Sequence, residues 1–368
     1  MKKKVVSVLL CAALVVSMAG CGSSKSKSEK SNDEKEKKTS AQSKEDAPET
    51  TTVRLAQTPS GQIINAIADK QGFLKDEGIT VEYVPCESGA DAFTAMSSGK
   101  VDVISTAGTN SPLQYIAKGT DLTIFGGYMI TGCMPIIAKK GTQWNGVEDL
   151  IGKTVAESPT FYQVTGPLLD KGYDPVNDVK WLNLTNAKDR VEAVRSGEAD
   201  YSILPTGQMY TVENTEDVEI VAYSSDVLPN YSCCRAEANT DWIKKNPNTV
   251  KALLRAWIRA QEYYEDHKDE AISMLAEELG TPDEYVAAYV NNDHLNLNVD
   301  PYKKSVEKAW GYIGQLGFLD ANSSNINIDD HINTELYKAA LDQCVESYHD
   351  DDPDFYDSQL KIFEENNQ

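Results

Sequence analysis

Small hydroxyl and amide side chains follow one of the short apolar segments of this sequence, in the run from Thr106 to Asn110. A helix-forming segment, 113–118, comes soon after them. In open α/β sheets, ligands bind beyond the carboxyl ends of strands, where the N–H groups of the next helix favour polar or anionic groups. Hydroxyl and amide groups orient a ligand without a large desolvation cost. The run is therefore predicted to be a loop that binds a small molecule reversibly.

Residue types that usually carry catalysis are scattered along the chain. All four histidines lie in the C-terminal third, far from the predicted binding loop, at His267, His294, His331 and His349. Cys233 and Cys234 could be reactive or bind iron, but neighbouring side chains of a strand point to opposite faces, which favours packing. No nucleophile, base and orienting partner occur at a readable spacing. The sequence predicts no catalytic residue, no metal site and no cofactor, and hence no enzyme.

The elements that hold the predicted loop alternate short apolar strands with amphipathic helices. This order is typical of a largely parallel sheet with helices on its faces. The first series of such elements places strands at 53–56, 78–84 and 101–104. A second series begins near Lys139 and ends with a strand at 218–223 that leads back to the first.

A two-lobe α/β fold follows from this order of elements. Because the second series is inserted into the first, residues 53–137 and 224–368 are predicted to form lobe I, and residues 138–223 to form lobe II. The remainder of lobe I is mostly helical and ends in a helical C-terminal extension. Its last residues, 364–368, are polar and are expected to fray.

The first 52 residues have the composition of a targeting segment and a tether. Lys2 to Lys4 and an apolar run precede Ala19-Gly20-Cys21, which is the layout of a secretory signal peptide over residues 1–20. The cut site resembles the lipobox of bacterial lipoproteins, which implies that Cys21 is lipidated. Residues 21–52 contain no aromatic residue, no Ile, Leu or Val, and are predicted to be a disordered tether.

Charge and cysteine content exclude two classes of protein. Three lysines leave with residues 1–20, so 32 basic residues stand against 57 acidic ones, a net charge of −25. Nucleic acid is therefore not a predicted partner. The cysteines after Cys21 are too scattered for a disulfide scaffold or a zinc pattern, and most are predicted to be buried as small apolar residues, at Cys86, Cys133, Cys233, Cys234 and Cys344.

Four segments give the chain a family resemblance. They are 66–79, which contains Gly-Phe-Leu-Lys-Asp-Glu-Gly-Ile, the two strand entries at 97–103 and 195–201, and the Asp-Leu-Ile-Gly-Lys-Thr-Val-Ala run at 149–156. Over residues 53–319 the chain resembles the solute-binding proteins of bacterial ABC importers of the nitrate, sulfonate, taurine and thiamine-precursor group. The resemblance implies a two-lobe periplasmic-binding-protein fold, crossed by two hinge strands, that closes over its ligand.

The same resemblance implies which loops form the ligand pocket. The ligand-binding residues predicted in this way are Thr58, Ser60, Gly61, Gln62, Thr106, Ala107, Gly108, Thr109, Asn110, Ser158, Thr160, Phe161, Tyr162, Pro205 and Gln208. Phe161, Tyr162 and Tyr128 could stack on a planar ring. The implied partners are a small-molecule ligand, the permease and ATPase subunits of an importer, and the membrane through lipidated Cys21. The chain is expected to be a monomer held at the extracytoplasmic face.

The nature of the ligand stays open at this point. No arginine or lysine occurs in the predicted loops, although one is expected where a sulfonate or nitrate binds. Neutral helix ends can still hold an anion. The sequence thus allows a small anion and favours a neutral, zwitterionic or heteroaromatic ligand such as a vitamin or pyrimidine precursor. Two other functions remain as alternatives: an enzyme of the same fold, such as a pyrimidine synthase, and a surface lipoprotein that senses a ligand.

Overall fold

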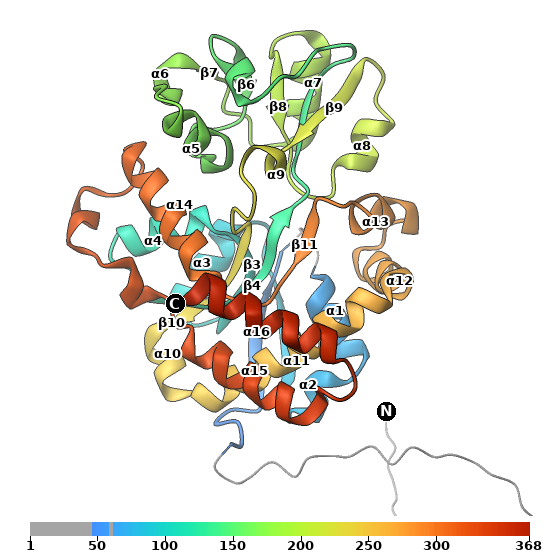
Figure 1. Ribbon diagram of the computed structural model, residues 1–368, viewed down its shortest axis with the longest axis vertical. Coiled ribbons are helices and arrows are strands. Elements are labelled where there is room, and N and C mark those ends of the chain that lie inside the picture. The colour runs from blue at the N-terminus through green and yellow to red at the C-terminus, as the bar shows by residue number, and fades with distance from the viewer. Residues whose placement is uncertain (1–45, 59–61) are drawn as a thin grey trace, which may run out of the picture. The chain divides into compact units, whose positions relative to one another are not determined.

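The computed structural model describes residues 46–58 and 62–368 (Figure 1). The predicted signal peptide, the predicted lipidation site Cys21 and most of the predicted tether lie outside the described residues. The last part of the tether is described, and it packs on the start of helix α11 (Pro247–Asp266). The Glu49 carboxylate accepts hydrogen bonds there from the backbone N–H groups of Asn248, at 3.1 Å, and Thr249, at 2.9 Å. Packing thus extends to the N-terminal side of Val53.

Six strands form the first sheet, in the order β11-β4-β10-β3-β1-β2. Their bounds are β1 Thr52–Gln57, β2 Thr80–Pro85, β3 Val103–Gly108, β4 Leu122–Gly132, β10 Cys234–Asn239 and β11 Leu295–Leu297. Strands β1, β2 and β3 pair in parallel, as predicted, whereas β10 runs antiparallel between β3 and β4. Buried aliphatic residues of β1 and β3 explain why these segments are strands at the centre of a core.

Five strands form the second sheet, in the order β7-β6-β8-β5-β9. Their bounds are β5 Pro135–Lys139, β6 Thr154–Ala156, β7 Lys180–Trp181, β8 Tyr201–Ile203 and β9 Val218–Tyr223. The chain passes from the first sheet to the second between β4 and β5, and it returns between β9 and β10. Both crossings contain non-glycine residues in the left-handed region, with φ of 39° at Cys133 and 58° at Ser232.

Helices account for most of the remaining described chain. The shorter and middle helices are α1 Ile63–Lys70, α2 Phe73–Asp76, α3 Gly89–Ser97, α4 Asn110–Ala117, α5 Tyr162–Asp170, α6 Pro175–Asp178, α7 Ala187–Ser196, α8 Met209–Glu213, α9 Ser224–Val227, α10 Thr240–Lys245, α12 Lys268–Leu279 and α13 Asp283–Val290, with 3-10 turns at Val147–Leu150, Ala321–Asn325 and Ile328–His331. None of the helices in the described ranges has both the length and the apolar composition that crossing a bilayer requires.

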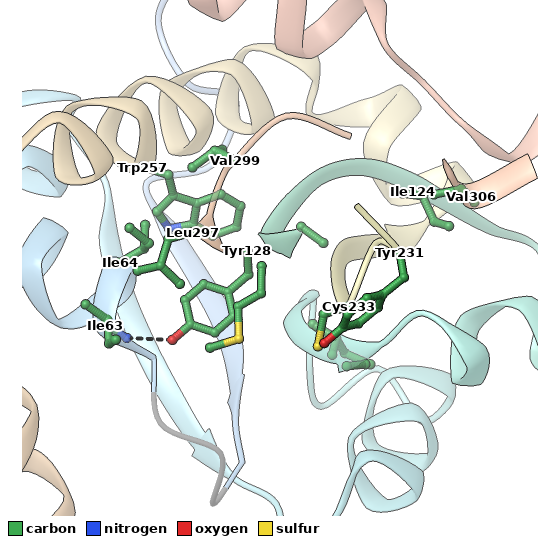
Figure 2. Packing of buried hydrophobic residues seen from close by; sticks show 14 of the residues in the cluster. Ile63, Ile64, Ile124, Tyr128, Tyr231, Cys233, Trp257, Leu297, Val299 and Val306 are labelled. Carbon is green, nitrogen blue, oxygen red and sulfur yellow. Dashed lines mark hydrogen bonds between the residues drawn. The ribbon is translucent and has the colours of Figure 1, made fainter. Parts of the chain in front are cut away.

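The long helix α11 organises the core below the first sheet. Pro247 occupies its first turn, where a missing backbone N–H costs nothing. Trp257 of α11 is only 2% exposed, and its ring stacks on Phe125 of β4, with 6.3 Å between the ring centroids. Figure 2 shows the same indole beside Leu297 and Val299, which lie in the C-terminal part of the chain. The stripe of apolar residues on α11 is therefore core rather than a binding site.

The helical C-terminal extension packs firmly against the rest of the chain. It consists of α14 Lys303–Gln315, α15 Glu335–Tyr348 and α16 Pro353–Asn367, and α15 lies on α11 (Figure 1). The expectation that the last residues fray is wrong for Asn367, whose Nδ2 donates to both carboxylate oxygens of Asp300 at 2.8 and 2.9 Å. A buried carboxylate needs hydrogen-bond donors, and the end of the chain supplies one.

Candidate functional site

A cavity of about 220 Å³ lies where elements of the two sheets meet. Strands β3 and β4, the start of α4 and the start of β10 contribute lining residues from the first sheet and its helices. The start of α5 and the segment after β8 contribute from the second sheet. The residues that line the cavity are Thr106, Gly108, Thr109, Asn110, Ser111, Tyr128, Met129, Met134, Phe161, Gln163, Pro205, Thr206, Cys233 and Cys234.

Six of the predicted site residues come together at this cavity. They are Thr106, Gly108, Thr109, Asn110, Phe161 and Pro205. The segment from Thr106 to Gly108 was predicted to be a loop, but it is the last part of strand β3. Helix α4 already begins at Asn110. The strand is longer than its apolar pattern because Gly108 pairs with Cys234 of β10, a partner 126 residues further along the chain.

Two predicted residues of the first loop lie behind the cavity wall rather than on it. The hydroxyl of Thr58 is 3.2 Å from the hydroxyl of Thr106. Gln62 is 1% exposed, and its Nε2 donates to the carbonyl of Ala56 at 2.8 Å and to the Thr106 hydroxyl at 3.3 Å. This network fixes the side chain of Thr106. Ser60 and Gly61, the other residues predicted in this loop, lie outside the described residues.

Four further predicted residues do not line the cavity either. Ala107 alternates with its strand neighbours and is buried in the core on the other face of β3. The hydroxyls of Ser158 and Thr160 satisfy each other, at 2.9 Å, in the turn before α5. Gln208 is directed toward Tyr285, with 3.5 Å between its Nε2 and the phenolic oxygen. Core packing accounts for Ala107, and a side-chain partner within hydrogen-bond distance accounts for each of the other three.

Tyr162 has a structural role that the sequence did not indicate. Its side chain is 1% exposed, and its hydroxyl donates to the backbone carbonyls of Tyr231 and Ser232, the latter at 3.1 Å. Tyr231 and Ser232 belong to the crossing from β9 back to β10. The phenol therefore joins helix α5 to that crossing, and Tyr162 does not line the cavity.

Tyr162→Phe is expected to lower the free energy of unfolding by about 1–2 kcal/mol, because the buried carbonyl of Tyr231 loses its donor and that of Ser232 keeps only the hydroxyl of Thr109. Urea denaturation of the full chain measures this change. The matched control is Tyr173→Phe, since Tyr173 is 37% exposed. If the two variants unfold at the same urea concentration, the hydroxyl of Tyr162 does not stabilise the crossing.

Charge is absent from the cavity wall as far as the described residues go: no Lys, Arg, His, Asp or Glu side chain lines it. Arg235, next to Cys234 in β10, is fully buried and directs its Nη1 and Nη2 to the carbonyls of Asp300 and Met129, both at 2.7 Å. Burial lowers the pKa of Arg235. The wall thus offers hydroxyl and amide groups, aromatic surface and sulfur, but no formal charge.

Several lining residues were missed from the sequence. Tyr128 was expected to stack on a ligand, and it does line the cavity, but its hydroxyl accepts a hydrogen bond from the N–H of Ile63 at 3.1 Å (Figure 2). No local sequence pattern indicated that four other residues would line the cavity, namely Met129, Met134, Gln163 and Thr206. Cys233 is buried in the core, as predicted, and Cys234 is partly buried against it. The two side chains do not point to opposite faces, however, since both line the cavity and their Sγ atoms are 3.4 Å apart.

Comparison with known proteins finds likenesses over most of the chain. The family described as NMT1/THI5 like matches residues 62–271. The taurine-binding periplasmic protein of Escherichia coli (strain K12) is 26% identical over 250 residues, which are 64% of this chain and 74% of that protein. The crystal structure of the periplasmic nitrate-binding protein NrtA from Synechocystis PCC 6803 matches with a TM-score of 0.64 at 17% identity, over 81% of this chain and 90% of that one.

The solved structures confirm the predicted fold class, a two-lobe α/β fold of the periplasmic-binding-protein type. The fold by itself does not decide between binding and catalysis. The desulfurization enzyme DSZB also matches, with a TM-score of 0.57 at 15% identity, over 80% of this chain and 99% of that one. The chemistry of the cavity therefore has to decide between a binding protein and an enzyme.

Proposed function

Since this chain belongs to the NMT1/THI5-like family, we propose that it captures a small solute in the cavity between its two sheets and delivers it to an ABC importer. The sequence resembles the solute-binding proteins of ABC importers, and the similarity to a taurine-binding periplasmic protein supports this resemblance. The observation that carries the proposal is the cavity itself, which is lined from both sheets by uncharged donors and apolar side chains. Such a wall suits a ligand that must be released again.

A small organic anion is the ligand class that we favour. Taurine and nitrate, in the names of the two relatives, are respectively a sulfonate and a small oxyanion. Here Thr109 and Asn110 bring the start of helix α4 to the cavity, and a helix start favours negative charge. Phe161 and Met129 offer apolar contacts for the organic part. Without a cationic side chain in the wall, a neutral heteroaromatic solute stays the alternative.

Two lobes that close on the ligand form part of the proposal. Residues 53–137 and 224–368 would make up lobe I around the first sheet, and residues 138–223 lobe II around the second. The crossings at Cys133 and at Ser232 are the hinge strands, and each has a residue in the left-handed region. Conformational change in two-lobe proteins is concentrated at such segments, which absorb the change in φ and ψ.

Membrane attachment completes the proposed role. The signal peptide at residues 1–20 and lipidation of Cys21 would hold the protein at the extracytoplasmic face of the membrane, with residues 21–52 as tether. The permease and ATPase subunits of the importer are the proposed partners, and the chain would act as a monomer. A sensing lipoprotein is the alternative with the same anchor and the same cavity.

An enzyme of the same fold is the other alternative, because DSZB shares the fold. General acid and base chemistry needs a titratable group near the substrate. Among the residues that line the cavity, only the tyrosine and the two cysteines can titrate. The Tyr128 hydroxyl already accepts a hydrogen bond from Ile63, and burial raises its pKa. The two thiols contact each other at 3.4 Å, and among the residues that line the cavity there is no histidine, lysine or carboxylate to act as base toward a solute. Capture without chemical change of the solute therefore fits the wall better.

The test is a thermal-shift screen of the full chain against sulfonates, nitrate, pyrimidines, thiamine precursors and amino acids. A solute at 100 times its Kd should add about 2.7 kcal/mol to the free energy of unfolding. We expect sulfonates to raise the Tm and Phe161→Ala to weaken their Kd by about tenfold, through lost apolar contact.

Two results would count against the proposal. The matched control is Phe73→Ala, since Phe73 is a partly buried aromatic on α2, outside the cavity. Calorimetric Kd values that change equally in both variants would place the ligand elsewhere. A screen without any stabilising solute, in protein stripped of bound molecules, would favour docking or sensing over transport.

A further inference from the structure

Two neighbouring thiols share the wall of the cavity, and the proposed capture of a solute does not account for them. Cys233 is 5% exposed and Cys234 is partly exposed, and their Sγ atoms are in contact at 3.4 Å. All five cysteines in the described ranges are free thiols. Among them, this is the only pair joined by a sulfur contact.

The backbone before these cysteines turns both side chains to one side. Asn230 has a φ of 53° and Ser232 a φ of 58°, values that cost energy for residues other than glycine. The register between β10 and β4 also shifts between Cys234 and Arg235. Figure 2 shows the sulfur of Cys233 beside the ring of Tyr231 on this segment. Local strain of this kind gathers at functional sites and here sets two thiols against each other.

We propose that Cys233 and Cys234 are a redox modification site, which a hydroperoxide converts into a reversible disulfide in the wall of the cavity. The site is open to the cavity, where hydrogen peroxide, a molecule little larger than water, can reach the sulfur atoms. The modification does not depend on which solute the cavity binds. It therefore goes beyond the proposed transport function.

The surroundings of the two thiols differ in a way that assigns their roles. The hydrogen bond with Cys234, with help from the positive charge of Arg235, lowers the pKa of Cys233. The same contact, together with burial, raises the pKa of Cys234 well above its usual value. Thiolates, not thiols, attack oxidants. The Tyr231 side chain, which lies beside Cys233 (Figure 2), also lowers the pKa of Cys233 through a hydrogen bond. Cys233 is therefore assigned as the attacking residue, and Cys234 as the residue that resolves the product.

The reaction balances in two steps. The Cys233 thiolate attacks one oxygen of hydrogen peroxide, the O–O bond breaks, and a sulfenic acid forms while hydroxide leaves and takes up a proton as water. Cys234 then gives up its thiol proton, its sulfur attacks the sulfur of Cys233, and the S–O bond breaks with release of a second water. Two thiols are oxidised to one disulfide, and one peroxide is reduced to two waters.

The resulting bridge should be easy to reduce. Cα atoms of neighbouring residues are about 3.8 Å apart across a trans peptide bond. Ordinary disulfides span about 4.4–6.8 Å between Cα atoms, and bridges outside this range are strained and more readily reduced. A pool of low-molecular-weight thiols would therefore reopen the pair by thiol–disulfide exchange. Closing the bridge removes two S–H groups from the wall and pulls the sulfur atoms closer than their present contact.

Hydrogen peroxide treatment of the reduced full chain, followed by alkylation and peptide mass analysis, tests the proposal. We expect two alkylatable thiols to be lost together and the peptide that contains both cysteines to become lighter by two hydrogen atoms. Dithiothreitol should restore both thiols. The loss should be about tenfold faster than that of Cys86, a buried thiol without a neighbouring sulfur whose pKa burial raises.

Single variants separate the two roles. In Cys234→Ser, a sulfenic acid on Cys233 should persist and be trapped by a dimedone reagent. In Cys233→Ser, Cys234 should remain alkylatable after the same treatment. The proposal is overturned if wild-type protein keeps both thiols, if it gains oxygen on Cys233 while Cys234 is still alkylated, or if the bridge forms between two chains. The wild-type result stands even if a variant does not fold.

Discussion

Replacing Arg255 by methionine is expected to lower the free energy of unfolding by roughly 3–5 kcal/mol, because the change removes the guanidinium that pairs with a buried carboxylate. Arg255 of α11 is 7% exposed and Glu77, at the end of α2, is 6% exposed. The guanidinium donates to the Glu77 carboxylate through Nη2 and through Nε, the latter at 2.8 Å. Its Nη1 donates to Gln343 of α15 at 2.6 Å. One side chain thus joins three helices that are far apart in the sequence.

Urea denaturation measures this loss, and a second variant identifies its cause. Replacing both partners, in Arg255→Met with Glu77→Met, should recover much of the stability, since two apolar groups of similar size need no charge partner. The matched control is Arg195→Met, because Arg195 pairs with Glu192 on the surface of α7 and is 50% exposed. Surface pairs contribute at most about 1 kcal/mol. A small effect of Arg255→Met would mean that Glu77 has other stabilising contacts.

The arrangement of elements was largely predictable, because it depends on local patterns. Short apolar runs separated by amphipathic segments predicted the strands β1 and β2 and the parallel pairing between them. The return of the chain at Tyr223, where β9 ends, also followed from such a run. What the pattern did not give was the length of β3, since its last residues are held by β10 from a distant part of the chain.

The candidate site was predictable only at the level of segments. The position of hydroxyl side chains just after an apolar run predicted that Thr106 and Thr109 lie at the binding site, and both line the cavity. Individual roles depend on contacts between segments, such as the hydrogen bonds of Tyr162 to the returning crossing. The alternation rule failed at Cys233 because it assumes a regular strand, and Ser232 before it is left-handed. Asn230 and Ser232 are common turn residues, so they were the one available signal of an irregular approach.

Buried polar groups mark a second limit of local patterns. The polar end of the chain predicted fraying, yet Asn367 is held by Asp300, 67 residues away. Burial raises the pKa of Asp300 to about 6, and the Asn367 amide and the N–H of Tyr302 oppose that shift. The segment around Asp300 crosses β4 at a point where the backbones approach closely. That approach depends on a single glycine.

Gly127→Ala is expected to lower the free energy of unfolding by about 3 kcal/mol or more. Gly127 of β4 donates its N–H to the carbonyl of Val299 at 2.7 Å, so the segment after β11 lies directly on the strand. A Cβ at Gly127 would lie 2.5 Å from the carbonyl oxygen of Asp300 and 2.6 Å from Nη1 of Arg235. Overpacking costs about 1–3 kcal/mol where side chains can move. Here the main obstacle is backbone, and the Asp300 carbonyl that would be displaced also accepts a hydrogen bond from the buried guanidinium of Arg235.

The matched control for this variant is Gly311→Ala, in the middle of α14. No atom lies within 4 Å of a Cβ built there, and alanine is the better helix former, so stability should rise by about 0.5–1 kcal/mol. Opposite signs in urea denaturation of the two variants would trace the effect of Gly127→Ala to its close contacts and not to the added methyl group. Equal, small effects would show that the segment at Asp300 moves away from β4 at little cost. The buried guanidinium of Arg235 would then keep its carbonyl partner by moving with that segment.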